Sequence, residues 1–280
     1  MISDFARGQV SANGDAVLLV STHKGAAHFV PAIRATLAQS WPNHPHLRFV
    51  TDGGATGDDV LRANTSAYVP LMLEALSAVR LQFPDATHIF HMLEDHCPLR
   101  ACDHVHILQT LRLCVRNQLA SVCFVTYEWP WSASKVDLVD YAERLGLPHV
   151  DTVEMDGIRL GVVPKTFFRY FQVQPAIWRI DYLEKTLRSA VAANVIDPWA
   201  FEAFRWDGAE QHYVSQYPWP TVHHGFLVKG NVNLTAIDFA DRHLAKDLRR
   251  VLRLDAQRAM GGIRYTLRHI KRAFLRRLSR

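Results

Sequence analysis

The stretch HIFHMLEDH, residues 88–96, decides the fold that we expect of this chain. Residues 88–93 are mostly apolar, and they give way at once to Glu94, Asp95 and His96. A short apolar run that stops at polar residues is typical of a buried strand whose carboxyl end opens onto a loop. We therefore predict an acidic loop at the end of a strand in the interior of a sheet.

Three further apolar runs end in polar residues in the same way, and they lie at 16–20, 47–50 and 120–125. Between the runs, apolar residues recur at helical spacing, over about 30–37, 69–83 and 105–117. Alternating strands and helices predict an α/β fold, a mixed central sheet flanked by helices. Ligands of such sheets gather outside the carboxyl ends of the strands, so we expect the four polar loops to line one crevice.

Two adjacent carboxylates at the end of a buried strand repel each other, and a cation or a basic partner would relieve that cost. Carboxylate oxygens beside an imidazole suit Mn²⁺ or Mg²⁺, and such an ion can bridge the phosphates of a nucleotide. Glu94 and Asp95 are therefore candidate metal ligands. The alternative is an acidic, solvated loop or a cap for the following helix.

Composition describes an ordinary globular chain, with 49% hydrophobic and 21% charged residues in 280. The four cysteines form no CxxC pair, which favours reduced core residues over a zinc site. The N-terminus carries no apolar targeting segment, and no run approaches the roughly 18 apolar residues of a membrane span. We expect a soluble, cytoplasmic protein, and a peripheral position at the inner face of a membrane stays open.

The net charge of +5 is unevenly placed. Residues 249–280 hold eleven Lys or Arg and one acid, Asp255, which leaves 21 basic and 26 acidic residues in 1–248. We divide the chain into a catalytic domain, 1–245, and a basic amphipathic helical tail, 246–280. Such a tail suits an anionic membrane surface, nucleic acid, or packing on the body or on a second subunit.

Two motifs, in this order, resemble those of GT-A-type glycosyltransferases of bacterial polysaccharide and lipopolysaccharide biosynthesis. HIFHMLEDHCPL (88–99) is similar to the strand and DXD-like acidic pair that hold the metal in that family. FQVQPAIW (171–178), Leu183 and DPWAFE (197–202) resemble a "QPxIW…L…PWxFE" pattern of the same proteins. The chain departs from the family in having Glu-Asp-His in place of Asp-X-Asp, which leaves the metal ligands and the metal requirement open.

The resemblance implies a Rossmann-like GT-A fold, a nucleotide-sugar donor and Mn²⁺ or Mg²⁺. It assigns the donor and its phosphates to polar residues at the strand ends, namely Thr22, His23, Lys24, Asp52, Glu94 and Asp95. It also suggests His224 as a late histidine ligand of the metal. The alternatives are an Asp-Gly turn at Asp52, a surface loop at 22–24 and a structural histidine at 224.

Sugar transfer with inversion needs a carboxylate that takes the proton of the acceptor hydroxyl, and Glu202 is the best candidate. Asp197 and Pro198 predict a helix start, with Trp199 and Phe201 pointing into the packing, and Glu202 as a cap is the alternative. We expect an aromatic and polar substrate site formed by Gln174, Trp178 and Trp199 and by the loop residues Tyr127, Glu128 and Trp129. Core packing is the alternative for the tryptophans.

The function expected from the sequence is metal-assisted, inverting transfer of a sugar from a nucleotide sugar to a hydroxyl of a glycan or lipid-linked glycan. Two alternatives stay open. One is a glycosyltransferase that modifies hydroxymethylpyrimidine bases of DNA, which would give the basic tail a nucleic-acid partner. The other is a GT-A-like domain that binds a nucleotide or a partner protein without turnover.

Overall fold

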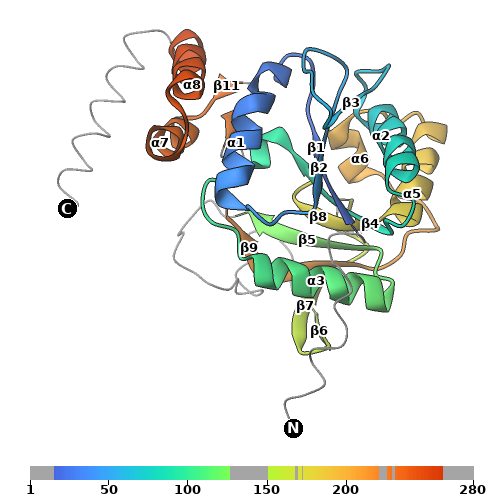
Figure 1. Ribbon diagram of the computed structural model, residues 1–280. Helices are drawn as coiled ribbons and strands as arrows, with labels where there is room; N and C mark the ends of the chain where they lie inside the picture. Colours follow the sequence, from blue (N-terminus) through green and yellow to red (C-terminus); the bar gives the residue numbers. More distant parts are fainter. Residues whose placement is uncertain are drawn as a thin grey trace.

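The computed structural model describes residues 16–126, 151–167, 170–171, 173–220, 226–228 and 231–260 (Figure 1). Within them, nine strands form one sheet in the order β3-β2-β1-β4-β8-β5-β9-β7-β6. In chain order these strands are β1 (Ala16–Ser21), β2 (His46–Thr51), β3 (Val60–Arg62), β4 (His88–Leu93), β5 (Ser121–Thr126), β6 (Thr152–Met155), β7 (Ile158–Val162), β8 (Ala176–Arg179) and β9 (His212–Trp219). A separate two-stranded sheet pairs β10 (Leu227–Val228) with β11 (Asn231–Val232).

Seven α-helices and two 3-10 turns accompany these strands in the described residues. The helices are α1 (Val30–Ser40), α2 (Tyr68–Gln82), α3 (His104–Asn117), α5 (Ile180–Ala192), α6 (Pro198–Ala203), α7 (Leu234–His243) and α8 (Lys246–Met260). The turns are η1 (Ala27–Phe29) and η2 (Glu94–His96). The strands and helices expected up to residue 126 are confirmed, and their ends lie close to the predicted ones except at the end of the first helix, which continues past residue 37 to Ser40.

The sheet is mixed, as expected. β1 pairs in parallel with β2 on one side and with β4 on the other, whereas β8 is antiparallel to both of its neighbours, β4 and β5. Ser21 lies in register with Val50 of β2 and Leu93 of β4, so these three strands end at one level. Their carboxyl ends therefore share one edge of the sheet.

Helices cover both faces of the sheet because the strands are apolar on both sides (Figure 1). Leu18 and Val20 of β1 pack in a cluster with Ile33 and Leu37 of α1, together with residues of α3 and α7. Val17 and Leu19 point the other way, into a cluster with residues of α2, α5 and α6. Two apolar cores therefore hold the strand ends in place from both sides.

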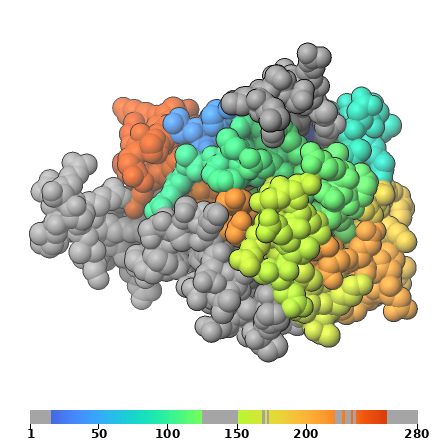
Figure 2. All heavy atoms as spheres, turned by 90° about the horizontal axis from the view of Figure 1, so that it is seen from below, coloured from blue at the N-terminus to red at the C-terminus, as the bar shows by residue number. Residues whose placement is uncertain are grey.

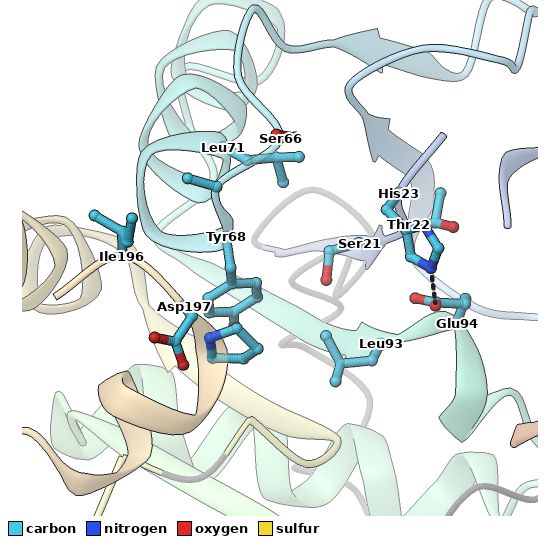
Figure 3. A pocket seen from close by; sticks show the side chains of 12 residues that line it. Ser21, Thr22, His23, Ser66, Tyr68, Leu71, Leu93, Glu94, Ile196 and Asp197 are labelled. Atoms are coloured by element: carbon cyan, nitrogen blue, oxygen red, sulfur yellow. Dashed lines mark ion pairs between the residues drawn. The ribbon is translucent and has the colours of Figure 1, made fainter. Parts of the chain in front are cut away.

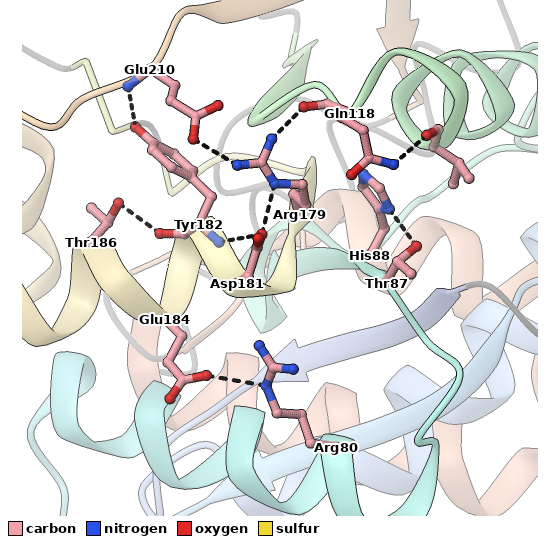
Figure 4. A network of polar contacts seen from close by, with 11 residues as sticks. Arg80, Thr87, His88, Gln118, Arg179, Asp181, Tyr182, Glu184, Thr186 and Glu210 are labelled. Atoms are coloured by element: carbon pink, nitrogen blue, oxygen red, sulfur yellow. Dashed lines mark hydrogen bonds and ion pairs between the residues drawn. The ribbon is translucent and has the colours of Figure 1, made fainter.

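A polar network fixes the opposite edge, where β4 begins (Figure 4). Arg179, at the end of β8, lies opposite His88 and binds Asp181 at 2.7 Å and Glu210 at 2.6 Å, and it also donates to the carbonyl of Gln118. Although burial disfavours both charged groups, these contacts raise the pKa of Arg179 and lower the pKa of Asp181. The network joins α3, β8, α5 and the segment before β9, far from the carboxyl ends of β1 and β4.

All four cysteines are free thiols. Cys102 is half-buried, and Cys97, Cys114 and Cys123 are buried, which confirms their predicted place in the core. Burial raises the pKa of each of these three thiols, so they stay protonated. No helix in the described part of the chain is long and apolar enough to cross a membrane.

The first part of the predicted tail is α8, which packs on α7, β11 and α1 at one side of the molecule (Figures 1 and 2). Leu252 and Ala256 are fully buried there, and the carboxylate of Asp255 accepts a 2.9 Å hydrogen bond from the backbone N–H of Val232. Packing, one of the roles weighed for the tail, is therefore observed for this helix. Residues 261–280 lie outside the described residues, and the division at residue 245 stays a prediction.

Candidate functional site

A pocket of about 390 Å³ opens beyond the carboxyl ends of β1 and β4 (Figure 3). The strand ends contribute Ser21, Thr22, His23, Leu93 and Glu94. The opposite wall comes from the start of α2, with Ser66, Ala67, Tyr68 and Leu71, and from the residues that lead into α6, Ile196, Asp197 and Pro198. The wall at α2 and α6 is thus mostly apolar, with Ser66 and Asp197 as its polar residues, and the wall at the strand ends is mostly polar.

The position of this pocket follows from the order of the strands. The chain leaves β1 and passes through α1 to β2 on one side, then returns through α2 to β4 on the other side of β1. The crossover through α1 leaves β1 toward one side and the crossover through α2 arrives at β4 on the other. A crevice therefore opens between β1 and β4, at the carboxyl ends of these two strands. Open α/β sheets bind their ligands at such a topological switch point.

His23 and Glu94 face each other across this crevice, with 3.8 Å between His23 Nε2 and Glu94 Oε1 (Figure 3). The backbone N–H of Gly25 donates to His23 Nδ1 at 3.1 Å. Because Nδ1 accepts, the proton of the neutral ring lies on Nε2, which is the atom that faces Glu94. A side chain at position 25 would crowd this ring, since a Cβ there would lie 2.9 Å from His23 Cε1.

Burial and the neighbouring charge of Asp95 raise the pKa of Glu94 to about 8. The turn that carries both acids is anchored by main-chain contacts, because Asp95 O accepts from the backbone N–H of Phe226 at 3.1 Å and His96 O accepts from the indole of Trp219 at 2.7 Å. Asp95 itself lies 3.5 Å from His96 Nδ1. Glu94 therefore ionises beside Asp95 only at an electrostatic cost, which bound positive charge would relieve.

Glu94 and Asp95 suit a divalent cation by chemistry, but they form only part of a ligand set. No cluster of three or more His, Cys, Asp or Glu side chains that could hold a metal occurs among the described residues. Glu94 lines the pocket, whereas Asp95 does not, and His224 lies outside the described residues. The two acids suit a cation whose remaining ligands come from a substrate or from elsewhere in the chain.

The loop after β2 supports the loop after β1. Asp52 Oδ1 accepts a 2.5 Å hydrogen bond from the backbone N–H of Lys24, and Thr22 N donates to Val50 O at 2.9 Å. Gly54 has a positive φ of 80°, and a Cβ there would lie 3.1 Å from Lys24 O. Thr22, His23, Lys24 and Asp52 thus meet at one place, as predicted, but neither Lys24 nor Asp52 lines the pocket.

Two hydroxyl groups at the end of β1 differ in their partners. Ser21 Oγ lies 2.9 Å from Nε2 of buried His91, whose pKa burial and His96 lower to about 3. Thr22 is 5% exposed, and its Oγ1 has no hydrogen-bond partner among the described residues. A buried hydroxyl without a partner is costly, and Thr22 lines the pocket, so this hydroxyl is a candidate ligand contact.

Glu202 is 5% exposed and lies outside the pocket lining. Its Oε1 accepts a 3.3 Å hydrogen bond from the backbone N–H of Val173. The Tyr68 ring lies between the pocket and α6, and burial together with the Glu202 charge raises the Tyr68 pKa. The structure therefore gives Glu202 a backbone-binding role, and its role as general base stays a prediction.

The predicted aromatic floor is not assembled at the pocket. Trp178 is 2% exposed and packs with Tyr182 and His212 in the apolar core between the sheet and α2 and α5. Asp197 caps α6 through Ala200 N, as predicted, and Phe201 is buried, but the inward orientation expected of Trp199 is wrong, since it is 60% exposed. Residues two apart on a helix point to opposite sides, so only one of the two can face the core.

Other predicted residues cannot be placed at the pocket. Gln174 is half-buried and is not part of the pocket lining. Tyr127, Glu128 and Trp129 lie outside the described residues. The wall formed by Ser66, Tyr68 and Ile196 was not predicted from the sequence.

Comparisons with known proteins give little further information. No family model and no curated protein matches the sequence. Three solved structures of mutant UDP-glucose pyrophosphorylase from Leishmania major, each in complex with UDP-glucose, share 12%, 10% and 11% identity over 67%, 78% and 75% of this chain. The TM-scores are 0.31, 0.32 and 0.32, and the chain spans 54%, 60% and 59% of the length of those enzymes. A likeness at this level carries no argument about fold or function.

Proposed function

We propose that this protein is a glycosyltransferase of the GT-A type that takes a sugar from a nucleotide-sugar donor and transfers it to a hydroxyl of a glycan or lipid-linked glycan. The observation that carries the proposal is the pocket at the switch point between β1 and β4, with Thr22 and His23 on one side and Glu94 on the other. The acidic and aromatic sequence motifs that resemble GT-A enzymes supply the reaction class.

The donor fits the two kinds of wall. The apolar side, with Tyr68, Leu71 and Ile196, offers surface to a base or sugar ring, and the Thr22 hydroxyl, which has no partner in the part of the chain that the structure describes, offers a hydrogen bond. A divalent cation held by Glu94 and Asp95 would stabilise the charge of the departing diphosphate. The Nε2–H of His23 would donate a hydrogen bond beside that charge.

The test is a thermal-shift panel of nucleoside diphosphates and nucleotide sugars, with and without Mn²⁺, followed by detection of nucleoside diphosphate release with an acceptor mixture. We expect one nucleotide to stabilise the protein, more strongly with Mn²⁺, and its sugar conjugate to turn over. Binding without turnover would favour the non-catalytic alternative. No stabilisation by any nucleotide would overturn the proposal.

Thr22→Val sharpens this test because valine keeps the shape of threonine and removes only the hydroxyl. Within the described residues that hydroxyl has no partner to lose, so the unfolding midpoint should stay the same or rise. The affinity for the stabilising nucleotide should fall about five- to tenfold, the value of one hydrogen bond. Thr186→Val on α5 is the matched control, because its buried hydroxyl binds Tyr182 O at 2.9 Å, so that variant should lose stability and keep its affinity.

A further inference from the structure

We propose that the outward face of α8 docks this protein onto an anionic lipid surface. The face is defined by Lys246, Arg250, Val251 and Leu254, which recur at three- and four-residue steps on one side of the helix and are all exposed. Asp247, also exposed, lies on the same side and leaves the face with a net positive charge. This interaction goes beyond the proposed sugar transfer and does not depend on it.

The opposite side of α8 fixes the orientation of this face. Leu252 and Ala256 are buried in the core cluster that includes residues of α7 and β11, and the Asp255 carboxylate holds the N–H of Val232. Arg253 is bound to Asp241 of α7 at 2.7 Å. Since these contacts use other residues of the helix, α8 presents its outward face to the surroundings without having to detach from the body.

The exposed aliphatic residues are the first sign of a lipid partner. Val251 is 42% and Leu254 is 44% exposed, and on the helix Arg250 lies one turn before Leu254 and Lys246 one turn before Arg250. Aliphatic side chains gain free energy at the boundary between headgroups and acyl chains, and basic residues beside them bind the lipid phosphates. A nucleic-acid backbone would engage the basic residues but would leave both aliphatic residues in water.

The charge around this face is the second sign. The sequence that follows the helix, residues 261–280, contains seven Lys or Arg and no acid. A concentration of one charge attracts a surface of the opposite charge, and the attraction weakens with added salt.

A second copy of this chain fits the face less well. A stable dimer usually buries about 800 Å² per partner, far more than two aliphatic side chains provide. In a twofold contact the same face of each copy meets the other, and because Lys246 and Arg250 outnumber Asp247, net positive charge would face net positive charge. An anionic bilayer has neither disadvantage.

The experiment is co-sedimentation of the full chain with phosphatidylcholine vesicles, with and without phosphatidylserine, at low and high salt. We expect binding only to the vesicles with phosphatidylserine, and weaker binding at high salt. Val251→Ser with Leu254→Ser should lower the partition coefficient at least fivefold. Lys246→Gln with Arg250→Gln should lower it more than tenfold, since each basic residue contributes about a factor of five.

Asp247→Asn tests the sign of the charge effect. The substitution removes the acid from the face and changes the shape of the side chain little, so binding to the vesicles with phosphatidylserine should become several-fold tighter. The gain should disappear at high salt, because added ions screen exposed charges. Tighter binding caused by misfolding would persist at high salt, so this variant complements the two that weaken binding.

Matched controls lie on other surfaces. Leu81→Ser removes an exposed leucine from α2, and Arg112→Gln with Arg159→Gln removes two exposed arginines from α3 and β7. These variants should bind the vesicles like the wild type. All variants alter exposed residues, so their unfolding midpoints should stay close to that of the wild type, which thermal unfolding checks.

Three outcomes would overturn the proposal. They are equal binding to vesicles with and without phosphatidylserine, vesicle binding that Val251→Ser with Leu254→Ser leaves unchanged, and a dimer in gel filtration that the same variant converts to a monomer. A DNA duplex that competes with the vesicles and binds this variant like the wild type would assign the face to nucleic acid instead. None of these measurements uses a sugar donor, so a failure here leaves the proposed glycosyltransferase untouched.

Discussion

His23 Nε2 lies 3.8 Å from Glu94 Oε1, so the loop after β1 and the acidic end of β4 meet at the pocket. The contact joins segments that are far apart in the chain, and it lies where two crossovers diverge. Gly25 and Asp52 hold the histidine side of the contact through backbone hydrogen bonds. The geometry of the site therefore depends on these supporting residues as well as on the pair itself.

Glu94→Gln should change how stability depends on pH. The folded pKa of about 8 exceeds the ordinary carboxyl value of 4.5, so the wild type loses stability as pH rises from the unfolded pKa through the folded one. Glutamine carries no charge and avoids that loss. At about pH 9 we expect the variant to be more stable than the wild type, by a few kcal/mol at most, since one pKa unit is worth about 1.4 kcal/mol. At about pH 4 the two proteins should differ little in stability.

Thermal unfolding with a chelator present, at several pH values, measures this difference. Glu154→Gln, at an exposed position on β6, is the control and should track the wild type at every pH. A Glu94→Gln curve parallel to that of the wild type across the whole range would contradict the raised pKa.

Gly54→Ala should cost more stability than Gly53→Ala. Both glycines have a positive φ, so alanine is strained at either position. Only at position 54 would the new Cβ also approach another loop, at 3.1 Å from Lys24 O, whereas nothing lies within 4 Å of a Cβ at position 53. We expect about 1 kcal/mol for the strain in both variants and a further loss of about 1 kcal/mol in Gly54→Ala from the close contact. Chemical denaturation measures the two losses, and equal values would show that the loops are not locked together.

Glu202→Gln and Glu202→Ala separate a structural acid from a general base. Because Glu202 is buried and binds Val173 N, we expect glutamine, which keeps the acceptor oxygen, to leave kcat near the wild-type value. Alanine removes the acceptor from a buried N–H and should lower the free energy of unfolding by about 1–3 kcal/mol. If both variants instead lose about 100- to 10,000-fold in kcat and glutamine leaves stability intact, Glu202 is the base that the sequence suggested.

Trp199→Ala should leave stability within about 0.5 kcal/mol of the wild type, because the ring is largely exposed. If the ring binds the acceptor sugar, KM for the acceptor should rise several-fold while donor affinity stays constant. Trp178→Ala is the contrasting variant, since a buried tryptophan should cost about 3–5 kcal/mol. Steady-state kinetics with varied acceptor, alongside thermal unfolding, decides between a substrate contact and an exposed ring without function.

The parallel half of the fold was predictable because its longer strands are compact apolar runs that stop at polar residues. β4 and its acidic end at Glu94 are the clearest case, and the predicted meeting of the loops at 22–24 and 52 follows from parallel strands alone. β8 and β9 were not predicted as strands, since the residues around Trp178 and His212 show no alternation that distinguishes a strand from buried packing.

The far wall of the pocket could not be predicted either. Tyr68 and Ile196 belong to segments whose approach to β1 depends on how α2 and α5 pack on the sheet, and tertiary packing leaves no local signal. The same limit explains Trp199 and Trp178, because an aromatic motif does not show which ring faces the core. Burial of Glu202 behind Tyr68 is likewise a property of the assembled chain.

The antiparallel strand β8 separates β4 from β5, and this order has a consequence for how the protein is made. Residues 176–179, which form β8, leave the ribosome long after residues 88–93 of β4 and 121–126 of β5. Until β8 is synthesised, the edges of β4 and β5 that pair with it have no partner. The nascent chain therefore exposes two apolar strand edges for the time needed to synthesise the intervening residues, and shielding of those edges by chaperones would protect it from aggregation.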